Sequence, residues 1–338
     1  MGKTRVAING FGRIGRNAFK IAFENEDLEV VALNDLTDNA TLAHLLKYDT
    51  NYGKYQYTVA SNDDGLLVNG TLVKVLSEPD PTKLPWADMD IDIVIESTGR
   101  FVETEKAKMH ITAGAKKVVI SAPSKTDGTT TVVLGVNDDD ISTDNVVLSN
   151  ASCTTNCITP PAAVIESNFG IDKAMMTTIH SYTADQSIQD GPHKDLRRAR
   201  AAAENIIPTT TGAAIAASEA LPSLAGKFDG LAIRVPTSVV SLSDFTFLLN
   251  KDVTEDQVNT AFKEAASMPI YKGILAVTDE PLVSSDFIGN PHSCIVDLGL
   301  TKVVGGNMLK VVAWYDNEWG YSNRLVELVS DVGKTLQK

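Results

Sequence analysis

The chain has 338 residues, of which 43% are hydrophobic, and its formal net charge is -13. This length predicts two domains. The acidic balance argues against binding to nucleic acid or to an anionic membrane through bulk charge, so any phosphate site must be built locally. Three cysteines are too few for a disulfide framework and fit reduced thiols. No signal segment or membrane helix is recognisable, so we expect a cytoplasmic protein.

Apolar runs alternate with helical patterns in the first half of the chain. Residues 5–9 and 28–33 are typical of buried strands, and residues 14–24 of an amphipathic helix. An Asn-Gly turn predicts a hairpin over residues 66–75. Further strands are predicted at residues 91–95, 118–120, 132–136 and 146–148. This alternation predicts an α/β fold, with a Rossmann-type, doubly wound parallel sheet over residues 1–152.

Longer β-rich runs dominate the chain after residue 153. A helix is expected to reach Phe169 and to end at Gly170. Strands are predicted at residues 175–179, 231–240, 245–249, 295–304 and 309–315, the last two joined as a hairpin by the turn at 305–307. We therefore expect an α+β catalytic domain with a mostly antiparallel sheet over residues 153–316. A C-terminal helix within residues 317–338 should pack back on the first domain.

The sequence GFGRIG at residues 10–15 matches the G-x-G-x-x-G fingerprint of dinucleotide-binding proteins. It follows a predicted strand and opens a predicted helix, which is the context that the motif needs. Gly10 allows the tight turn, Gly12 lets the backbone approach the pyrophosphate, and Gly15 permits close helix–strand packing. Asp35, at the end of the second strand, would accept hydrogen bonds from ribose hydroxyls and repel a 2′-phosphate. The pattern favours NAD over NADP.

Cys153 stands between hydroxyl residues at a strand–helix junction, and three roles compete for it. A metal site would need further ligands at close spacing, which the other cysteines and histidines do not form, so no metal is expected. A buried, inert thiol suits Cys157 and Cys294. In the first turn of a helix the dipole would stabilise a thiolate, which favours a nucleophile at Cys153. His180, at the end of an apolar strand, is the candidate base, with a structural histidine as the alternative.

Two features indicate an anion site. Residues 209–212, TTTG, precede an Ala-rich helix and make a hydroxyl-rich helix start. Arg234 lies inside an apolar strand, where its charge calls for an anionic partner, either a ligand or an internal salt bridge. A basic cluster at residues 193–200 is too short and isolated to indicate nucleic-acid binding.

Five segments together resemble the phosphorylating glyceraldehyde-3-phosphate dehydrogenase family, along the full chain. They are INGFGRIGR at 8–16, ASCTTNC at 151–157, HSYT at 180–183, DLRRAR at 195–200 and WYDNEWGY at 314–321. The resemblance implies oxidation of D-glyceraldehyde 3-phosphate to 1,3-bisphosphoglycerate with reduction of NAD. It implies that Cys153 is the nucleophile, which forms a thiohemiacetal and then a thioester, and that His180 is the base.

The resemblance also implies binding residues and an assembly. The expected cofactor contacts are Gly10, Gly12, Arg13, Ile14, Gly15, Asp35, Thr98, Ser121 and Asn317. The expected contacts to the phosphorylated aldehyde and to inorganic phosphate are Ser152, Thr154, Thr183, Arg198, Thr211, Gly212 and Arg234. Residues 182–203 resemble the family's S-shaped loop, which packs near a neighbouring subunit's cofactor. That loop implies a homotetramer.

Three positions depart from the family pattern: Pro79, Ser187 and Gly191. Gly191 stands where NAD-specific members usually have a bulky apolar residue, which leaves room for some use of NADP. Asp35 and Leu36 keep NAD as the expected cofactor. The alternatives are an erythrose-4-phosphate dehydrogenase, a cysteine hydrolase and a non-enzymatic, NAD-binding redox sensor. A hydrolase has no need of the dinucleotide fingerprint, and a sensor would lack phosphate-dependent turnover.

Overall fold

The computed structural model describes residues 2–124 and 126–337, and the chain forms two compact units. The first unit contains Met1–Val132, Asp138–Ala151 and Ser322–Lys338. The second contains Val133–Asn137 and Ser152–Tyr321. Among the described residues no helix has the length and apolar character needed to cross a bilayer.

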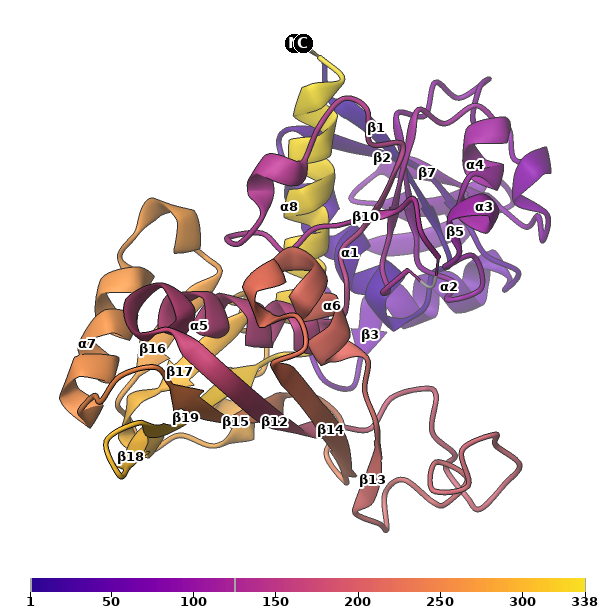
Figure 1. Cartoon of the computed structure of the whole chain (residues 1–338). Coiled ribbons are helices and arrows are strands. Elements are labelled where there is room, and N and C mark those ends of the chain that lie inside the picture. The colour runs from indigo at the N-terminus through magenta and orange to yellow at the C-terminus, as the bar shows by residue number, and fades with distance from the viewer. Residues whose placement is uncertain (1, 125, 338) are drawn as a thin grey trace. The chain divides into compact units, whose positions relative to one another are not determined.

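A nine-stranded sheet forms the centre of the first unit (Figure 1). Its strands in spatial order are β10 (Thr130–Thr131), β11 (Val147–Ser149), β9 (Lys117–Ile120), β8 (Ile93–Glu96), β1 (Thr4–Asn9), β2 (Leu28–Asn34), β7 (Thr71–Leu76), β6 (Gly65–Val68) and β5 (Val59–Asn62). The strands from β10 to β7 are all parallel, whereas β7, β6 and β5 pair antiparallel at one edge. The Rossmann-type parallel sheet is therefore confirmed.

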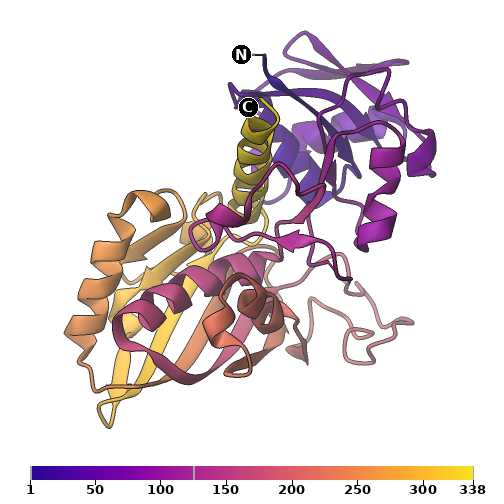
Figure 2. The same cartoon turned by 45° about the horizontal axis from the view of Figure 1, so that its top comes forward.

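Helices of the first unit follow the strands as the sequence pattern predicts. They are α1 (Arg13–Glu24), α2 (Asn39–Lys47), α3 (Thr104–Ala107), α4 (Met109–Thr112) and, from Ser322 on, α8 (Trp319–Thr335); a short ladder pairs β3 (Tyr48–Asp49) with β4 (Gly53–Lys54). Asn69 and Gly70, with φ of 49° and 82°, form the predicted turn between β6 and β7. Figure 2 shows the two ends of the chain close together, and Gln337 donates a hydrogen bond to the Gly2 carbonyl at 3.0 Å.

The second unit has an eight-stranded, mostly antiparallel sheet, as expected. Its strands are β13 (Ile207–Thr210), β14 (Phe228–Val235), β12 (Ile171–Ser181), β15 (Ser241–Leu249), β19 (Met308–Tyr315), β17 (Cys294–Asp297) and β16 (Leu275–Thr278), with β18 (Lys302–Val304) paired to β19. The helices α5 (Cys153–Phe169), α6 (Ala213–Ala220) and α7 (Glu255–Ala266) cover one face of this sheet (Figure 1). Gly170 ends α5 with a φ of 72°.

Three predicted strands are wrong in extent. Residues 132–136 were expected to form a strand, but β10 ends at Thr131, and residues 134–136 form a turn within the second unit. Val132, Val133 and Leu134 are buried although they lie outside any strand, so their burial does not indicate a strand. β14 stops at Val235 because Pro236 has no N–H for the ladder. The run 295–304 is interrupted by a 3-10 turn at Leu298–Leu300.

Candidate active site

Cys153 is the first residue of α5, where the sequence places it. Ser152 is the N-cap of the helix, and its hydroxyl accepts a hydrogen bond from the Thr155 N–H at 3.0 Å. The Cys153 side chain is only partly buried. Its Sγ lies 3.4 Å from Nε2 of His180, which is within the hydrogen-bond range for sulfur. The structure thus brings together the predicted nucleophile and its predicted base.

The surroundings of this pair oppose an isolated charge on either partner. Burial raises the pKa of the Cys153 thiol, and the positive charge of Arg234 together with hydrogen bonding by Thr154 opposes that rise. Burial, followed by the charge of Arg234, lowers the pKa of His180 to about 3. The imidazole is therefore unprotonated at neutral pH and can accept a proton. Transfer from sulfur to imidazole creates opposite charges in direct contact, which stabilise each other.

Arg234 reaches His180 because their strands pair in register. β12 and β14 run parallel, with His180 directly opposite Arg234. Nη1 of Arg234 lies 2.7 Å from Nδ1 of His180 and donates to the Ser181 carbonyl at 3.0 Å. The same Nδ1 lies 2.6 Å from that carbonyl. A guanidinium can only donate, so Nδ1 either accepts from Arg234 or carries a proton toward Ser181, but not both. The position of Arg234 therefore decides whether Nε2, the nitrogen that faces Cys153, carries the ring proton or a lone pair.

Tyr315 is a residue of this site that the sequence analysis did not single out. Its hydroxyl lies 3.0 Å from Oγ1 of Thr154 and 2.8 Å from Oγ1 of Thr178. Its ring meets the His180 ring edge-on at 6.0 Å. Burial raises the pKa of Tyr315, so the hydroxyl keeps its proton. The signals in the sequence were its place at the end of an apolar strand and within the segment WYDNEWGY at 314–321.

The predicted anion contacts come from several loops of the second unit. Arg198 donates to Oγ1 of Thr209 at 2.9 Å and to the Thr210 carbonyl at 3.2 Å, and it pairs with Asp185. Burial lowers the pKa of Arg234, and the charge of Arg198 lowers it further, which shows two cations in one neighbourhood. Such a pair favours binding of an anion.

Hydroxyl groups near these arginines have protein partners. The Ser152 hydroxyl caps α5, and the Thr154 hydroxyl is buried against Tyr315. Thr211 accepts from the Ala213 N–H at 3.2 Å, and the backbone of Thr183 exchanges hydrogen bonds with Gln186. Gly212 is the N-cap of α6 and has no side chain to cap it.

Asn317 is joined to the end of β12 by one serine. The Ser181 N–H donates to Oγ of Ser241 at 3.1 Å, and that hydroxyl donates to Oδ1 of Asn317 at 2.9 Å. The Asn317 side chain is 5% exposed. Its amide therefore has a set orientation, with the oxygen held by Ser241.

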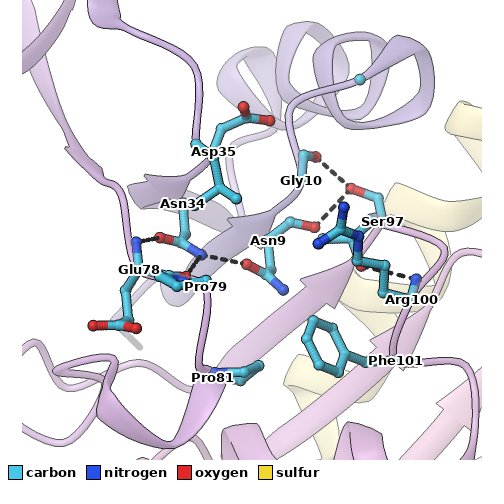
Figure 3. A pocket seen from close by; sticks show the side chains of 13 residues that line it. Asn9, Gly10, Asn34, Asp35, Glu78, Pro79, Pro81, Ser97, Arg100 and Phe101 are labelled. Atoms are coloured by element: carbon cyan, nitrogen blue, oxygen red, sulfur yellow. Dashed lines mark hydrogen bonds between the residues drawn. The ribbon is translucent and has the colours of Figure 1, made fainter.

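A pocket in the first unit follows the carboxyl ends of β1, β2 and β8 (Figure 3). Residues of four short segments line it: Asn9, Gly10, Gly12, Asn34, Asp35, Leu36, Glu78, Pro79, Pro81, Ser97, Thr98, Arg100 and Phe101. Ligands of open parallel sheets bind at this end of the strands. The Asp35 carboxylate could accept hydrogen bonds from the ribose of an adenosine, and the backbone N–H groups of the glycine turn could donate to a pyrophosphate.

The glycine motif fits a dinucleotide sterically. A Cβ on Gly10 would lie 2.7 Å from the Thr98 nitrogen, and a Cβ on Gly15 would lie 2.1 Å from the Gly10 carbonyl oxygen. A Cβ on Gly12 would meet nothing within 4 Å, so the space beside it is open to a ligand. Asp35 accepts from the Phe11 N–H at 2.8 Å, which holds its carboxylate at the turn.

The remaining predicted cofactor contacts lie at the same end of the sheet. Ile14 lies in the first turn of α1, after the glycine turn. The Arg13 guanidinium has a partner within the protein, because it forms a bidentate ion pair with the Asp49 carboxylate at 2.6 and 3.2 Å. Ser121 follows β9, and its N–H donates to the Glu96 carbonyl at 2.9 Å. Among the described residues no cluster of three or more His, Cys, Asp or Glu side chains could hold a metal ion.

A dinucleotide-type α/β unit and a second unit with a Cys–His pair characterise an NAD-dependent oxidoreductase. Comparison with known proteins agrees with this class. A model described as "Glyceraldehyde 3-phosphate dehydrogenase, NAD binding domain" matches residues 4–104, and one described as the C-terminal domain of the same enzyme matches residues 152–317.

Full-length relatives point to the same enzyme. The chain is 56% identical over 334 residues to a glyceraldehyde-3-phosphate dehydrogenase of Streptomyces coelicolor, covering 98% of this chain and 99% of the relative. It is 55% identical over 340 residues to that of Mycolicibacterium smegmatis, with coverage of 98% and 99%. It is 55% identical over 329 residues to glyceraldehyde-3-phosphate dehydrogenase 1 of Bacillus cereus, with coverage of 97% and 98%. The chain belongs to the glyceraldehyde-3-phosphate dehydrogenase family.

Proposed function

We propose that the protein oxidises D-glyceraldehyde 3-phosphate and captures the product with inorganic phosphate, giving 1,3-bisphosphoglycerate. The observation that carries this proposal is the contact between Cys153 and His180, 3.4 Å apart at the start of α5, beside Arg234. NAD, when bound, supplies the acceptor for a hydride. Gly10, Gly12, Gly15 and Asp35 would hold its pyrophosphate and adenosine, with Arg13, Ile14, Thr98 and Ser121 nearby and Asn317 for the nicotinamide amide.

The residues of the second unit support two covalent stages. His180 accepts the thiol proton, Cys153 Sγ adds to the aldehyde carbon, and His180 returns the proton to the resulting oxyanion, which gives a thiohemiacetal and a neutral imidazole. His180 then takes the hydroxyl proton as the hydride leaves, which yields a thioester on Cys153. Phosphate oxygen attacks the thioester carbonyl, the C–S bond breaks, and the acyl phosphate departs. The thioester keeps the free energy of oxidation that hydrolysis would lose.

Two anion sites are needed for this chemistry. We assign the phosphate of the aldehyde to Arg234 and Thr183, and inorganic phosphate to Arg198, Ser152, Thr154, Thr211 and Gly212. The arginines support the assignment because the charge of Arg198 lowers the pKa of Arg234, and a bound anion would relieve that repulsion. A substrate phosphate on Arg234 would also draw the guanidinium away from Nδ1 of His180. The proton on Nδ1 can then bind the Ser181 carbonyl, and Nε2 presents its lone pair to Cys153.

Formation of NADH from NAD and D-glyceraldehyde 3-phosphate should depend on inorganic phosphate. Without phosphate the thioester accumulates, so we expect a burst of about one NADH per protomer followed by slow turnover. Stopped-flow absorbance at the NADH band, with and without phosphate, measures this. Equal steady rates in both conditions would contradict the acyl-phosphate product.

Arg234→Gly tests the assignment of the substrate phosphate. We expect the KM of the phosphorylated aldehyde to rise by about 100-fold, since a charge-assisted contact to phosphate is lost, while the KM of NAD changes less than about twofold. Parallel increases in both constants would indicate that Arg234 is structural.

We also propose a homotetramer that works in the cytoplasm. Met175, Leu231 and Met308 share the sheet face opposite the helices, and they are 64%, 43% and 49% exposed. An exposed apolar face of this kind is typical of a subunit interface. Light scattering should give four times the 36.2 kDa protomer mass, and a monomer mass would refute the assembly. The three cysteines are all free, which suits a reducing compartment, and cell fractionation tests the location.

A further inference from the structure

Glu96, at the end of β8, accepts hydrogen bonds from several pocket residues although it is only 1% exposed. Its Oε1 accepts from the N–H and the hydroxyl of Thr98, at 2.8 and 2.5 Å. Its Oε2 accepts from Nδ2 of Asn9 at 2.6 Å and lies 3.1 Å from Nε2 of His110. Thr98 and Asn9 line the pocket of Figure 3, whereas Glu96 and His110 do not.

The tautomer of His110 follows from its other neighbour. Nε1 of Trp86 lies 3.1 Å from Nδ1 of His110, and both side chains are fully buried. An indole N–H can only donate, so Nδ1 must be the acceptor. The ring proton therefore sits on Nε2 and points at Glu96. His110 is neutral, and its contact with Glu96 is a hydrogen bond rather than an ion pair.

A second chain of hydrogen bonds reaches Glu96 from the opposite side of the pocket. The backbone N–H of Glu78 donates to Oδ1 of Asn34 at 2.9 Å, which settles the orientation of that amide. Nδ2 of Asn34 then donates to Oδ1 of Asn9 at 2.7 Å. This orients Asn9 so that its Nδ2 donates to Glu96. Figure 3 shows the links from Glu78 through Asn34 to Asn9.

Three of the four chains that end at Glu96 start from a group that can only donate; the fourth starts from the Thr98 hydroxyl. These groups are the Trp86 indole N–H and the backbone N–H groups of Glu78 and Thr98. No member can be reversed without placing two donors face to face. Glu96 must therefore accept the bonds from the Thr98 N–H, Asn9 and His110, one of them on Oε1 and two on Oε2, which a carboxyl group can do and an amide cannot. Its orientation controls the segments at Asn9, Asn34 and Thr98.

We propose that Glu96, oriented by His110, is a positioning residue for NAD. It holds three pocket-lining segments in one geometry before the cofactor arrives, which lowers the ordering cost of binding. His110 adds a packing link, since its ring meets that of Phe101 in the pocket wall edge-on at 6.3 Å. The inference deepens the proposed function, because it concerns the affinity of the same cofactor site.

The test is the Kd of NAD for the full chain, measured by titration calorimetry without aldehyde. Glu96→Gln keeps the shape but turns one acceptor into a donor, so we expect the Kd to rise by about tenfold or more. The KM of NAD should rise in parallel, and kcat at saturating NAD should change less than about twofold. Glu96→Asp keeps the carboxylate, so the Kd of NAD should rise less than in Glu96→Gln. His110→Phe keeps a ring but removes the donor to Glu96. Its Kd for NAD should lie between those of Glu96→Asp and Glu96→Gln.

The matched control is Val94→Ala, in the same strand and fully buried. It should lower the Tm through lost packing while leaving the Kd of NAD within about twofold. The proposal is overturned if Glu96→Gln binds NAD like the unchanged chain, or if Val94→Ala weakens binding equally. If Glu96→Gln does not fold, the Kd of NAD for Glu96→Asp and His110→Phe tests the proposal instead. Binding like that of the unchanged chain in both variants would overturn it. An unchanged chain that fails to bind NAD would instead refute the proposed function.

Discussion

Replacing Cys153 with serine is expected to lower kcat for NAD-dependent aldehyde oxidation by at least about 10⁴-fold, because the nucleophile itself is lost. A serine hydroxyl keeps the shape of the helix start but cannot become an anion at neutral pH beside an imidazole of low pKa. The Kd of NAD should stay unchanged, since the pocket lies in the first unit. NADH formation and calorimetric titration of NAD measure the two quantities on one preparation.

Cys157→Ala is the matched control for that loss. Cys157 lies in the same helix and is fully buried, and burial raises the pKa of its thiol well above the usual range. We expect its removal to lower the Tm through a small cavity and to leave kcat within about threefold. Full turnover by Cys153→Ser, or equal losses in both variants, would end the assignment of Cys153 as the nucleophile.

His180→Asn is expected to lower kcat by about 10²- to 10⁴-fold, the usual contribution of a positioned general base. The pH dependence of the thiol should change as well. Burial raises the pKa of Cys153, and we expect the His180 imidazole, 3.4 Å from Sγ, to offset that rise in the unchanged chain by taking the proton. Without the imidazole, thiolate should form only at higher pH. The rate of alkylation by iodoacetamide, followed from pH 5 to 10, should shift its midpoint upward in the variant.

His44→Asn supplies the comparison for the alkylation profile, because His44 is exposed on α2 in the first unit. Its profile should overlay that of the unchanged chain. An unshifted midpoint in His180→Asn would mean that the imidazole has no part in forming the thiolate, whatever its effect on turnover.

Local patterns were sufficient where one segment carries its own signal. The glycine turn with Asp35, the Asn-Gly hairpin and the helix start at Cys153 each depend on neighbours in the chain, and each appears where it was predicted. Residues 132–136 failed for the opposite reason. Val132, Val133 and Leu134 are buried, but a short apolar run reads the same whether it is buried in a turn or in a strand.

Contacts between distant segments were beyond the reach of such patterns. The roles of Tyr315 and Glu96 arise from partners such as Thr178 and Asn9, which lie 137 and 87 residues away in the chain. A buried glutamate at the end of a strand and a histidine in a short helix carry no local mark of this network.

The amino-acid sequence by itself determined the two fold classes, the dinucleotide turn and a cysteine at the first position of a helix, because these follow from side-chain periodicity and backbone preferences of adjacent residues. Only the tertiary structure decided that His180 stands opposite Arg234 and reaches Cys153. It also decided that Glu96 accepts hydrogen bonds from Asn9, Thr98 and His110. Strand register and the direction of buried hydrogen bonds depend on packing across the whole unit, which no local run of residues specifies.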